Sequence, residues 1–534
     1  MSATVFENAV VHQRPGVLAP VEALAVRDGR IVRAGTVAEC RDAVPDGGRV
    51  DLQGRTVIPG LIDSHVHALQ MATQSLELDL SGCRSFSEIL HAVEAELNSL
   101  APRGATSAGW LLAGGWGGWG GDGSWAGGGP DLAALDRVTG AVPVALHAAD
   151  LHTYWLNTAA LERLGMVEHT RGAHPTGVIS EADAFAAQSR IESDTRHELE
   201  TRMDAVLLQF LQHGVTGIHD IDGTTALQYF RTAEAASRLP LRVHKLTAAS
   251  EMETLIADGI RSGDGSSWLR YGGVKIFADG SLSSHTCHLG EAFPGEPGNV
   301  GIATTERGEL TRLIAHCEAN GLSVAVHAIG DQAVHDAVAA LATGRRLDTV
   351  PHRIEHLQHA RAADIVRFAK LGAVACMQPS SCTTDYPVVD RLLGDRDLIS
   401  YGWRSLLDAG ATVAFSSDAP VESINPFLGM HAAITRQRLG GAPDGGWQPE
   451  QRITLAEAFA GYTTAAAAAS GESDTRGSLE VGRYADFAVL DRDPFLVDAA
   501  GLAGTRVETT VVDGSIVWTA GSAPQPPRVM ESAR

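Results

Sequence analysis

Residues 57–67 read VIPGLIDSHVH, a short apolar run that ends in two histidines separated by one residue. A run of this length, rich in valine, isoleucine and leucine, is typical of a buried β-strand. Side chains two apart on a strand point to the same side, so His65 and His67 are expected to project together from its C-terminal end. The motif alone is weak evidence of a metal site, because the chain contains 21 histidines.

Seven further runs of the same kind follow along the chain. They are AVPVALHA (141–148), GVTGIHD (214–220), GGVKIFADG (272–280), LSVAVHAIG (322–330), HRIEHLQH (352–359), GAVACMQPS (372–380) and TVAFSSDAP (412–420). Most precede stretches with helical spacing, of which 331–342 and 362–372 are good examples. Eight alternating strand and helix units predict an α/β fold, a (β/α)8 TIM-like barrel.

The two ends of the chain have a different pattern. ALAVRDGRIVRAG (23–35) and ETTVVDGSIVW (508–518) place strand-forming residues on either side of an Asp-Gly pair, which is typical of a β-hairpin. RYADFAVLD (483–491) also reads as a strand. We therefore predict a small β-sandwich domain built from both termini, residues 1–58 and 471–534, and a barrel domain over residues 59–470.

Composition and charge limit the binding partners and the cellular location that we expect for this protein. The 534 residues carry 64 acidic and 42 basic side chains, a formal net charge of −22 that argues against nucleic acid and anionic membranes as partners. The N-terminal stretch lacks the pattern of a signal peptide. The six cysteines are scattered and form no CxxC motif, which favours a reduced, cytoplasmic protein. A homodimer is the expected assembly of a soluble enzyme.

Polar residues stand where several of the apolar runs stop. His327 ends the fifth run, His356 the sixth and Asp418 the eighth, and Lys275 lies within the fourth. In a parallel barrel these strand ends form the catalytic face. Imidazole and carboxylate groups bind zinc and similar divalent cations, so the pattern predicts a metal centre.

Lys275 requires a separate explanation, because an ammonium group cannot bind a cation. Buried near positive metal charge, the amine is expected to lose its proton. A neutral amine can add carbon dioxide to form a carbamate, whose two oxygens can bridge two metal ions. The alternative is an ordinary salt bridge, for which Asp279 is the nearest acid in the sequence.

These motifs resemble the amidohydrolase superfamily in its binuclear form. VIPGLIDSHVH, GGVKIFADGSL, VHAIGD, RIEHLQH, SSDAP and RYADFAVLD resemble the branch that includes the N-substituted formamide deformylases, over nearly the whole chain. The resemblance implies two zinc-like ions, one held by His65 and His67 and the other by His327 and His356. It also implies that a carboxylated Lys275 bridges the ions. Asp418 would be both a ligand and the catalytic base.

The resemblance predicts hydrolysis of an amide-like, non-peptide C–N bond in a small molecule by a metal-activated hydroxide. Cyclic amide or imide hydrolysis and heterocycle deamination are alternatives on the same barrel. Gly330 stands where the mononuclear deaminases of the superfamily carry a glutamate, which counts against deamination. A non-catalytic barrel that binds a metal or ligand is a further alternative, although such a protein would not need Asp418.

Candidates for contacts with the substrate or with the metal ligands are less specific. Residues 114–130, GGWGGWGGDGSWAGGGP, are either a surface insertion or a loop whose tryptophans, including Trp116 and Trp119, cover an apolar pocket. We also assign substrate contacts to three histidines, for which packing roles are the alternative: His152, His219 and His285. Ser283 and His285 depart from the family motif, in which a glycine and an arginine stand. Asp63 and Glu355 are candidates to orient a histidine ligand.

Overall fold

A computed structural model describes residues 3–14, 16, 19–100, 109–117, 129–149, 152–171, 175–394 and 396–522. The chain divides into two compact units. The first, which we call the barrel unit, comprises Met1–His67, Leu207–Asp279 and His288–Arg534. The second, the inserted unit, comprises Ala68–Val206 and Gly280–Cys287. Each unit is described separately.

An eight-stranded sheet of parallel strands forms the centre of the barrel unit. In chain order its strands are β5 (Leu61–Val66), β11 (Val215–Asp220), β12 (Arg242–Ala248), β13 (Leu269–Phe277), β14 (Val324–Ala328), β15 (Arg353–His356), β17 (Val374–Met377) and β19 (Thr412–Phe415). A parallel bridge between Val66 and Ala419 joins the first strand to the segment after the last. The sheet is therefore a nearly closed barrel, as the sequence predicts.

The predicted set of eight barrel strands needs two corrections. AVPVALHA contains a strand, β8 (Val144–Ala148), but this strand belongs to a separate sheet in the inserted unit. The strand that was missed is β12, which carries the polar sequence RVHKLTA. GVTGIHD therefore supplies the second barrel strand instead of the third. The two errors cancel in the count, so Lys275 still lies on the fourth strand.

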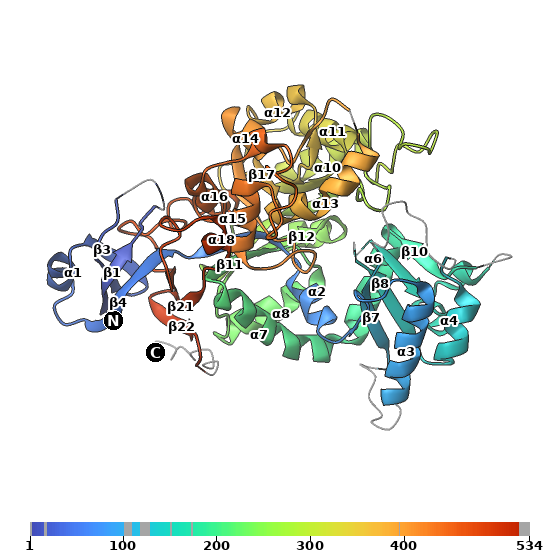
Figure 1. Cartoon of the computed structure of the whole chain (residues 1–534), viewed down its shortest axis with the longest axis horizontal. Helices are drawn as coiled ribbons and strands as arrows, with labels where there is room; N and C mark the ends of the chain where they lie inside the picture. The colour runs from blue at the N-terminus through green and yellow to red at the C-terminus, as the bar shows by residue number, and fades with distance from the viewer. Residues whose placement is uncertain are drawn as a thin grey trace. The chain divides into compact units, whose positions relative to one another are not determined.

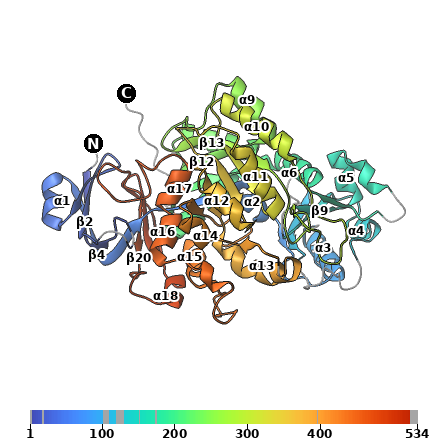
Figure 2. The same ribbon diagram turned by 90° about the horizontal axis from the view of Figure 1, so that it is seen from above.

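Helices surround the barrel strands in Figures 1 and 2. They include α8 (Thr224–Ala235), α9 (Met252–Ala257), α10 (Arg307–Ala319), α11 (Asp331–Leu341), α12 (Ala362–Phe368), α13 (Pro379–Leu392), α14 (Trp403–Asp408), α15 (Pro426–Thr435), α16 (Leu455–Gly461) and α17 (Thr464–Ala469). The two helices predicted at 331–342 and 362–372 are α11 and α12. Their apolar side chains, such as Val334 and Phe368, are buried, as expected of amphipathic helices that cover a barrel.

Strands from both ends of the chain share one seven-stranded sheet in the barrel unit. They are β1 (Ala3–Val11), β2 (Ala23–Arg27), β3 (Arg30–Gly35), β4 (Gly48–Pro59), β20 (Phe487–Leu490), β21 (Val507–Val512) and β22 (Ser515–Thr519). β4 and β20 pair antiparallel and join the two ends. Asp28 and Asp513 each precede a glycine and have positive φ, as the predicted two-residue hairpin turns require. Helix α1 (Val37–Ala43) lies beside this sheet in Figure 2. The β-sandwich itself and its domain boundaries stay predictions.

The inserted unit contains a sheet of five strands. They are β6 (Leu78–Asp79), β7 (Leu111–Trp116), β8, β9 (Thr153–Leu156) and β10 (Val178–Ser180). Helices α3 (Phe86–Leu100), α4 (Leu132–Thr139), α5 (Thr158–Leu164) and α6 (Ala182–Asp194) complete two apolar clusters, one of which includes Trp116 and Trp155. This second unit was not predicted from the sequence.

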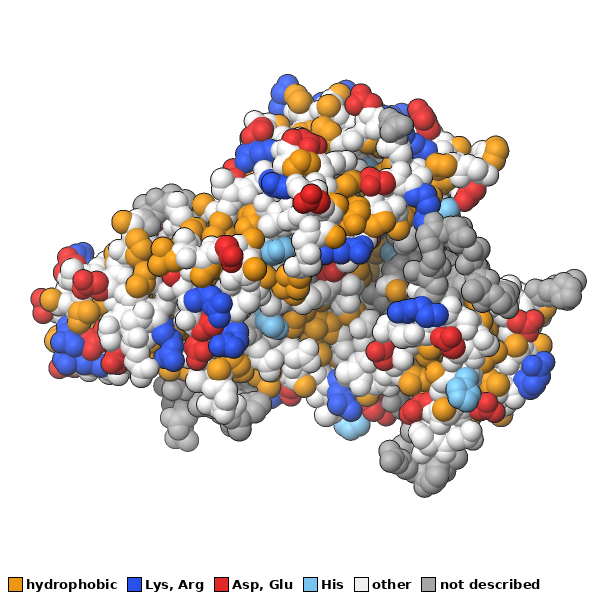
Figure 3. Space-filling model, viewed as in Figure 1, with side chains coloured by type: hydrophobic (Ala, Val, Ile, Leu, Met, Phe, Trp, Pro, Cys, Tyr) orange, Lys and Arg blue, Asp and Glu red, His pale blue; other side chains and the backbone are white. Residues whose placement is uncertain are grey.

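The outer surface carries charges of both signs. On the face drawn in Figure 3, basic and acidic side chains are interspersed with apolar ones. Within the part of the chain that the structure describes, no helix is both long enough and apolar enough to cross a lipid bilayer.

Candidate metal centre

His65 and His67 lie at the C-terminal end of β5, where alternation along the strand directs both to one side. The Nδ1 atom of His65 lies 2.5 Å from Oε2 of Glu355, and Nδ1 of His67 lies 2.9 Å from Oδ1 of Asp222. An ionised carboxylate only accepts hydrogen bonds, so each Nδ1 carries the proton. The Nε2 atom of each ring is therefore the one that could bind a metal ion.

Asp418 is the acid on which these two nitrogens converge. Its Oδ1 atom lies 3.2 Å from Nε2 of His65 and 3.4 Å from Nε2 of His67. The backbone N–H of Asp418 donates to the carbonyl of His65 at 2.9 Å, next to the bridge that closes the barrel. The closure of the barrel thus brings the first and last strands' functional residues together.

His356 and His327 extend this cluster along the barrel mouth. His356, at the end of β15, has its ring centroid 5.0 Å from that of His65 and 4.5 Å from that of His327. Its Nδ1 atom is 2.9 Å from Oε1 of Gln378, whose amide donates to Ser416. If Nδ1 is the protonated nitrogen, Nε2 of His356 is also available to a metal.

Asp279 follows β13 and lies beside His327. Its Oδ1 atom is 3.6 Å from Nε2 of His327 and accepts a hydrogen bond from the backbone of Ile329. Its Oδ2 atom accepts from the backbone N–H groups of Gly330 and His288. Three backbone donors therefore hold this carboxylate in place, and no ion pair to Lys275 is present among the described residues.

Lys275 is buried on β13, with 3% of its surface exposed. Its Nζ atom lies 5.0 Å from the centre of the Phe277 ring, and it makes no hydrogen bond or ion pair within the described parts of the chain. Burial lowers the pKa of Lys275 to about 8, although the nearby charges of Glu355 and Asp418 oppose this shift. The neutral amine is therefore accessible near physiological pH.

The donor atoms fit a divalent metal ion. Ligand atoms of His65, His356 and Asp418 all lie within 4.8 Å of one another. His67 approaches the same aspartate, and His327 packs against His356. Imidazole nitrogens with carboxylate or amide partners on the far side of the ring are the usual arrangement of histidine ligands. The chemistry of these donors therefore fits a divalent metal ion.

Of the two tryptophans assigned to substrate contacts, the structure describes Trp116. Trp116 is 2% exposed in the apolar core of the inserted unit, where its indole N–H donates to the carbonyl of Leu146 at 2.7 Å. Its ring packs against Phe86 and Trp155. This packing gives no support to a role in covering a pocket. Trp119 lies outside the described residues.

The three predicted substrate histidines have different surroundings. His152, in the inserted unit, has Nδ1 3.0 Å from a carboxylate oxygen of Glu181. His285 lies in a turn of the same unit, with φ of 57° and its N–H donating to Leu282. His219 is fully buried on β11, where Nδ1 is 2.9 Å from Nη1 of Arg353. The structure thus places His219 inside the barrel, and all three substrate contacts stay predictions.

Two of the residues that hold the histidine ligands were missed. Asp222 follows the second barrel strand by two residues, and that position beyond a strand end was the available signal. Gln378 directly follows β17, so the same signal was available for it. Of the two acids considered, Glu355 contacts an imidazole, whereas Asp63 accepts hydrogen bonds from the backbone of His65 and from the backbone and side chain of Ser417. Burial raises the pKa of Asp63 to about 7.

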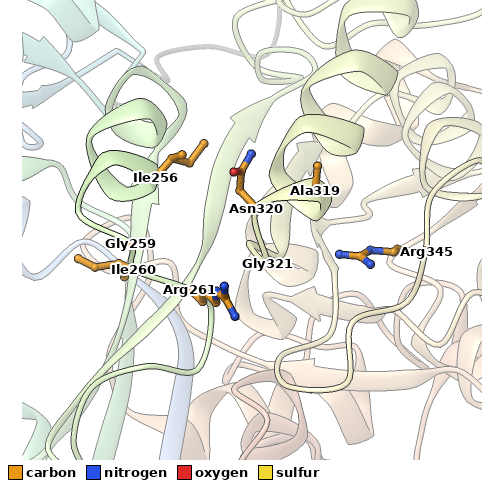
Figure 4. Close-up of a pocket in the computed structure, with 8 residues that line it drawn as sticks. All are labelled: Ile256, Gly259, Ile260, Arg261, Ala319, Asn320, Gly321 and Arg345. Atoms are coloured by element: carbon orange, nitrogen blue, oxygen red, sulfur yellow. The ribbon is translucent and has the colours of Figure 1, made fainter.

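A surface cavity lies away from this centre. It has a volume of about 320 Å³ and is lined by residues that precede β13, β14 and β15, among them Arg261, Asn320 and Arg345 (Figure 4). Those connections lie at the N-terminal ends of the strands. In a parallel barrel this is the face opposite the catalytic one, so the cavity is not the candidate active site.

Comparisons with known proteins extend over almost the whole chain. A family model described as the amidohydrolase family matches residues 49–518. Amidohydrolase YtcJ of Bacillus subtilis (strain 168) is 28% identical, with 93% of this chain and 96% of that protein covered. N-substituted formamide deformylase of Arthrobacter pascens is 28% identical, with 92% and 94% covered. The crystal structure of an uncharacterized metal-dependent hydrolase from Pyrococcus horikoshii OT3 is 27% identical, covers 93% of this chain and 99% of its own, and has a TM-score of 0.77.

Proposed function

This chain belongs to the amidohydrolase family and is a hydrolase of C–N bonds, and we propose that it cleaves an amide-like, non-peptide bond of a small molecule at a binuclear metal centre. One observation carries the proposal. The Nε2 atoms of His65 and His67 converge on Asp418 while carboxylates hold both Nδ1 atoms. An arrangement of this kind leaves three donors directed at one point.

The proposed ligand set has two halves. His65 and His67 would hold one ion, and His327 and His356 would hold the other, with Asp418 as a further ligand. Lys275 would connect the two halves. Its neutral amine would form a C–N bond with carbon dioxide while one C=O π bond opens, the proton of the amine would pass to solvent, and the resulting carbamate would offer its two oxygens as ligands. The burial of Lys275 and its lack of an ionic partner among the described residues support this role.

A divalent metal ion, when bound, lowers the pKa of water and polarises a carbonyl oxygen. Asp418 supplies the acid–base chemistry. Its carboxylate accepts the proton of the attacking water and then donates that proton to the departing nitrogen, so that the leaving group is a neutral amine. Glu355 and Asp222 keep the histidine rings oriented through the reaction. No nucleophilic serine or cysteine is required.

N-substituted formamides are the first substrate class to test, because the relative from Arthrobacter pascens carries that activity in its name. The products would be formate and a primary or secondary amine. Zinc is the first metal to test, since histidine and carboxylate ligands suit it. The six cysteines are free thiols, which supports the proposed cytoplasmic location. Light scattering tests the expected homodimer.

The decisive experiment combines metal analysis with turnover. Purified protein is expected to contain close to two zinc-like ions per chain and to release amine from N-formyl amines. A chelator should abolish turnover and added Zn²⁺ should restore it. His327→Ala should lose metal and activity, whereas His316→Ala, at an exposed histidine on α10, should keep both. Metal-loaded protein that cleaves no amide, imide or ester would contradict the proposal.

A further inference from the structure

Arg353 is a buried arginine in the interior of the barrel, with 2% of its surface exposed. Its guanidinium makes two hydrogen bonds to Glu355 on its own strand, from Nε to Oε1 at 2.8 Å and from Nη2 to Oε2 at 2.9 Å. Nη2 also donates to the backbone carbonyl of Ser64 at 2.5 Å. Nη1 lies 2.9 Å from Nδ1 of His219. One side chain therefore contacts three barrel strands.

These contacts cross the inside of the barrel. Arg353 and Glu355 lie on β15, whereas Ser64 and His65 lie on β5, and β17 and β19 separate these two strands around the barrel. No backbone ladder joins β5 to β15. Contacts made by side chains couple the two strands, and the guanidinium together with the carboxylate of Glu355 supplies the hydrogen bonds among them.

The chemistry of arginine determines which ring nitrogen of His65 carries the proton. A guanidinium only donates hydrogen bonds, so both oxygens of Glu355 act as acceptors and the carboxylate is ionised. Oε2 of Glu355 then accepts the Nδ1 proton of His65 at 2.5 Å. The lone pair of His65 is left on Nε2, the atom that faces Asp418.

The same guanidinium also holds the main chain next to the ligand. The carbonyl of Ser64 and the N–H of His65 form one peptide bond. The hydrogen bond that Nη2 donates to this carbonyl therefore restrains the backbone of His65. His219 must accept from Nη1 through Nδ1, which makes it a neutral histidine with its proton on Nε2. Because His219 is neutral, it adds no second positive charge that would draw Glu355 away from His65.

We propose that Arg353 is a positioning residue of the metal centre, which acts through Glu355 and Ser64 to fix the tautomer and orientation of His65. The inference rests on the proposed metal centre. Loss of Arg353 frees Glu355 to rotate and lets His65 place its proton on Nε2 for part of the time, which weakens metal binding. Partners of this kind change metal affinity by about 10- to 100-fold when they are removed.

The test uses Co²⁺ as the probe, with the full-length protein freed of metal. Affinity is measured by competition with a chelator, and the visible absorption of bound Co²⁺ reports the ligand geometry. Arg353→Met and Glu355→Gln are expected to weaken the first Co²⁺ by about 10- to 100-fold and to shift its spectrum. The double variant should be no weaker than the worse single variant, because both act on one histidine.

Arg242→Met is the matched control. Arg242 is equally buried in the same barrel and makes a similar bidentate pair, with Asp486 at 2.7 and 3.1 Å, but has no contact with a candidate ligand in the described structure. Its loss should lower the free energy of unfolding and leave the Co²⁺ affinity and spectrum of the folded protein unchanged. Such a result would distinguish a specific effect of Arg353 on the metal ligand from a general loss of barrel stability.

The outcomes are distinct. Wild-type protein that binds no Co²⁺ would overturn the metal centre itself. Wild-type affinity and spectrum in Arg353→Met, or equal losses in Arg353→Met and Arg242→Met, would overturn the positioning role. If Arg353→Met does not fold, Glu355→Gln and Arg353→Lys replace it. A lysine can donate to Glu355 but cannot also reach the remaining partners, so an intermediate affinity supports the proposal and an unchanged affinity overturns it.

Discussion

Two neighbouring strands of the barrel, β12 and β13, each carry one buried lysine, and the surroundings of the two differ. Nζ of Lys245 lies 2.9 Å from Oδ1 of Asp220 and donates to the carbonyls of Asp222 and Leu246. Lys275, on the next strand, faces the ring of Phe277 and makes no ion pair among the described residues. The exposed fractions are 1% and 3%, so burial does not distinguish them.

The difference shows how one residue type can serve two purposes in one barrel. A buried ammonium group is stable when an anion and carbonyl oxygens replace its water, and Lys245 has both. Lys275 lacks them, so its charged form is disfavoured and its amine is left for chemistry. We therefore regard Lys245 as part of the fold and Lys275 as part of the proposed centre.

Removal of Lys275 should have the largest effect on function. Lys275→Ala is expected to lower turnover by roughly 1,000-fold, because metal assistance supplies several kcal/mol and each 1.36 kcal/mol corresponds to a tenfold change in rate. At least one metal ion should be lost, as measured by elemental analysis. Acetate or propionate should restore part of the activity by replacing the carbamate. Retention of both metals would contradict the bridging role.

Removal of Lys245 should affect stability instead. Lys245→Met leaves Asp220 buried without its cation, which costs about 3–5 kcal/mol in comparable cases. Urea unfolding at pH 7 measures the loss. The folded fraction should retain the metal content and turnover of the wild type. If Lys245→Met instead lost its metal while its stability was unchanged, the contrast between the two lysines would fail.

The pH dependence of the metal-free protein offers a third test. The pKa of Lys275 is about 8 in the folded chain, against an ordinary value of 10.5, so the unfolded chain binds more protons between these values. The stability of the wild type should therefore rise with pH across that window. Lys275→Met lacks this contribution and should be more stable than the wild type at pH 7, by about 3 kcal/mol. The difference should vanish as the pH approaches 10.5.

This comparison requires buffer free of metal and carbon dioxide, since carbamate formation would remove the amine. Urea unfolding of both proteins at several pH values between 7 and 10.5 provides the measurement. A stability difference that does not change with pH would show that Lys275 titrates normally in the folded protein.

The smallest effect on stability is expected when Lys245 loses its anionic partner, so that its surroundings resemble those of Lys275. Asp220→Asn keeps the shape of the acid but removes its charge, while both carbonyl acceptors remain. We expect a loss of about 2 kcal/mol at pH 7, near the value of a hydrogen bond to a charged group. Urea unfolding of the variant and the wild type at pH 7 measures the loss. An unchanged free energy of unfolding would argue that the charge of Asp220 contributes little to the stability of this pair.

The residues of the candidate centre that could be picked from the sequence are those that depend on local pattern. His65, His327, His356 and Asp418 each stand where an apolar run stops, and the structure brings their strand ends to one side of the barrel. The hairpin turns could also be predicted, because an Asp-Gly pair favours positive φ at both positions.

The strand β12 was missed for a physical reason. Arg242, His244 and Lys245 give it a polar sequence, although every residue except the last is buried. Its charges are neutralised by Asp486 and Asp220, which come from other segments. A hydrophobic run such as β8 reveals a buried strand but not the sheet to which it belongs. The inserted unit was missed for this reason.

The partners of the metal ligands depend on distant segments. Glu355 meets His65 across 290 positions, and Asp222 meets His67 across 155. No spacing rule links residues so far apart. Trp116 illustrates the opposite error, since its glycine-rich neighbourhood suggested a loop while the side chain itself is part of a core.

Two of the candidate ligands have an unusual backbone. Asp418 has φ of 56° and His356 has φ of 68°, a left-handed conformation in which asparagine, aspartate and histidine are enriched and most other residues are rare. The main chain thus restricts which donor types these positions accept. An engineer who sought a different metal by introducing glutamate or cysteine there would encounter a conformational penalty of about 1–2 kcal/mol, before any question of coordination arose.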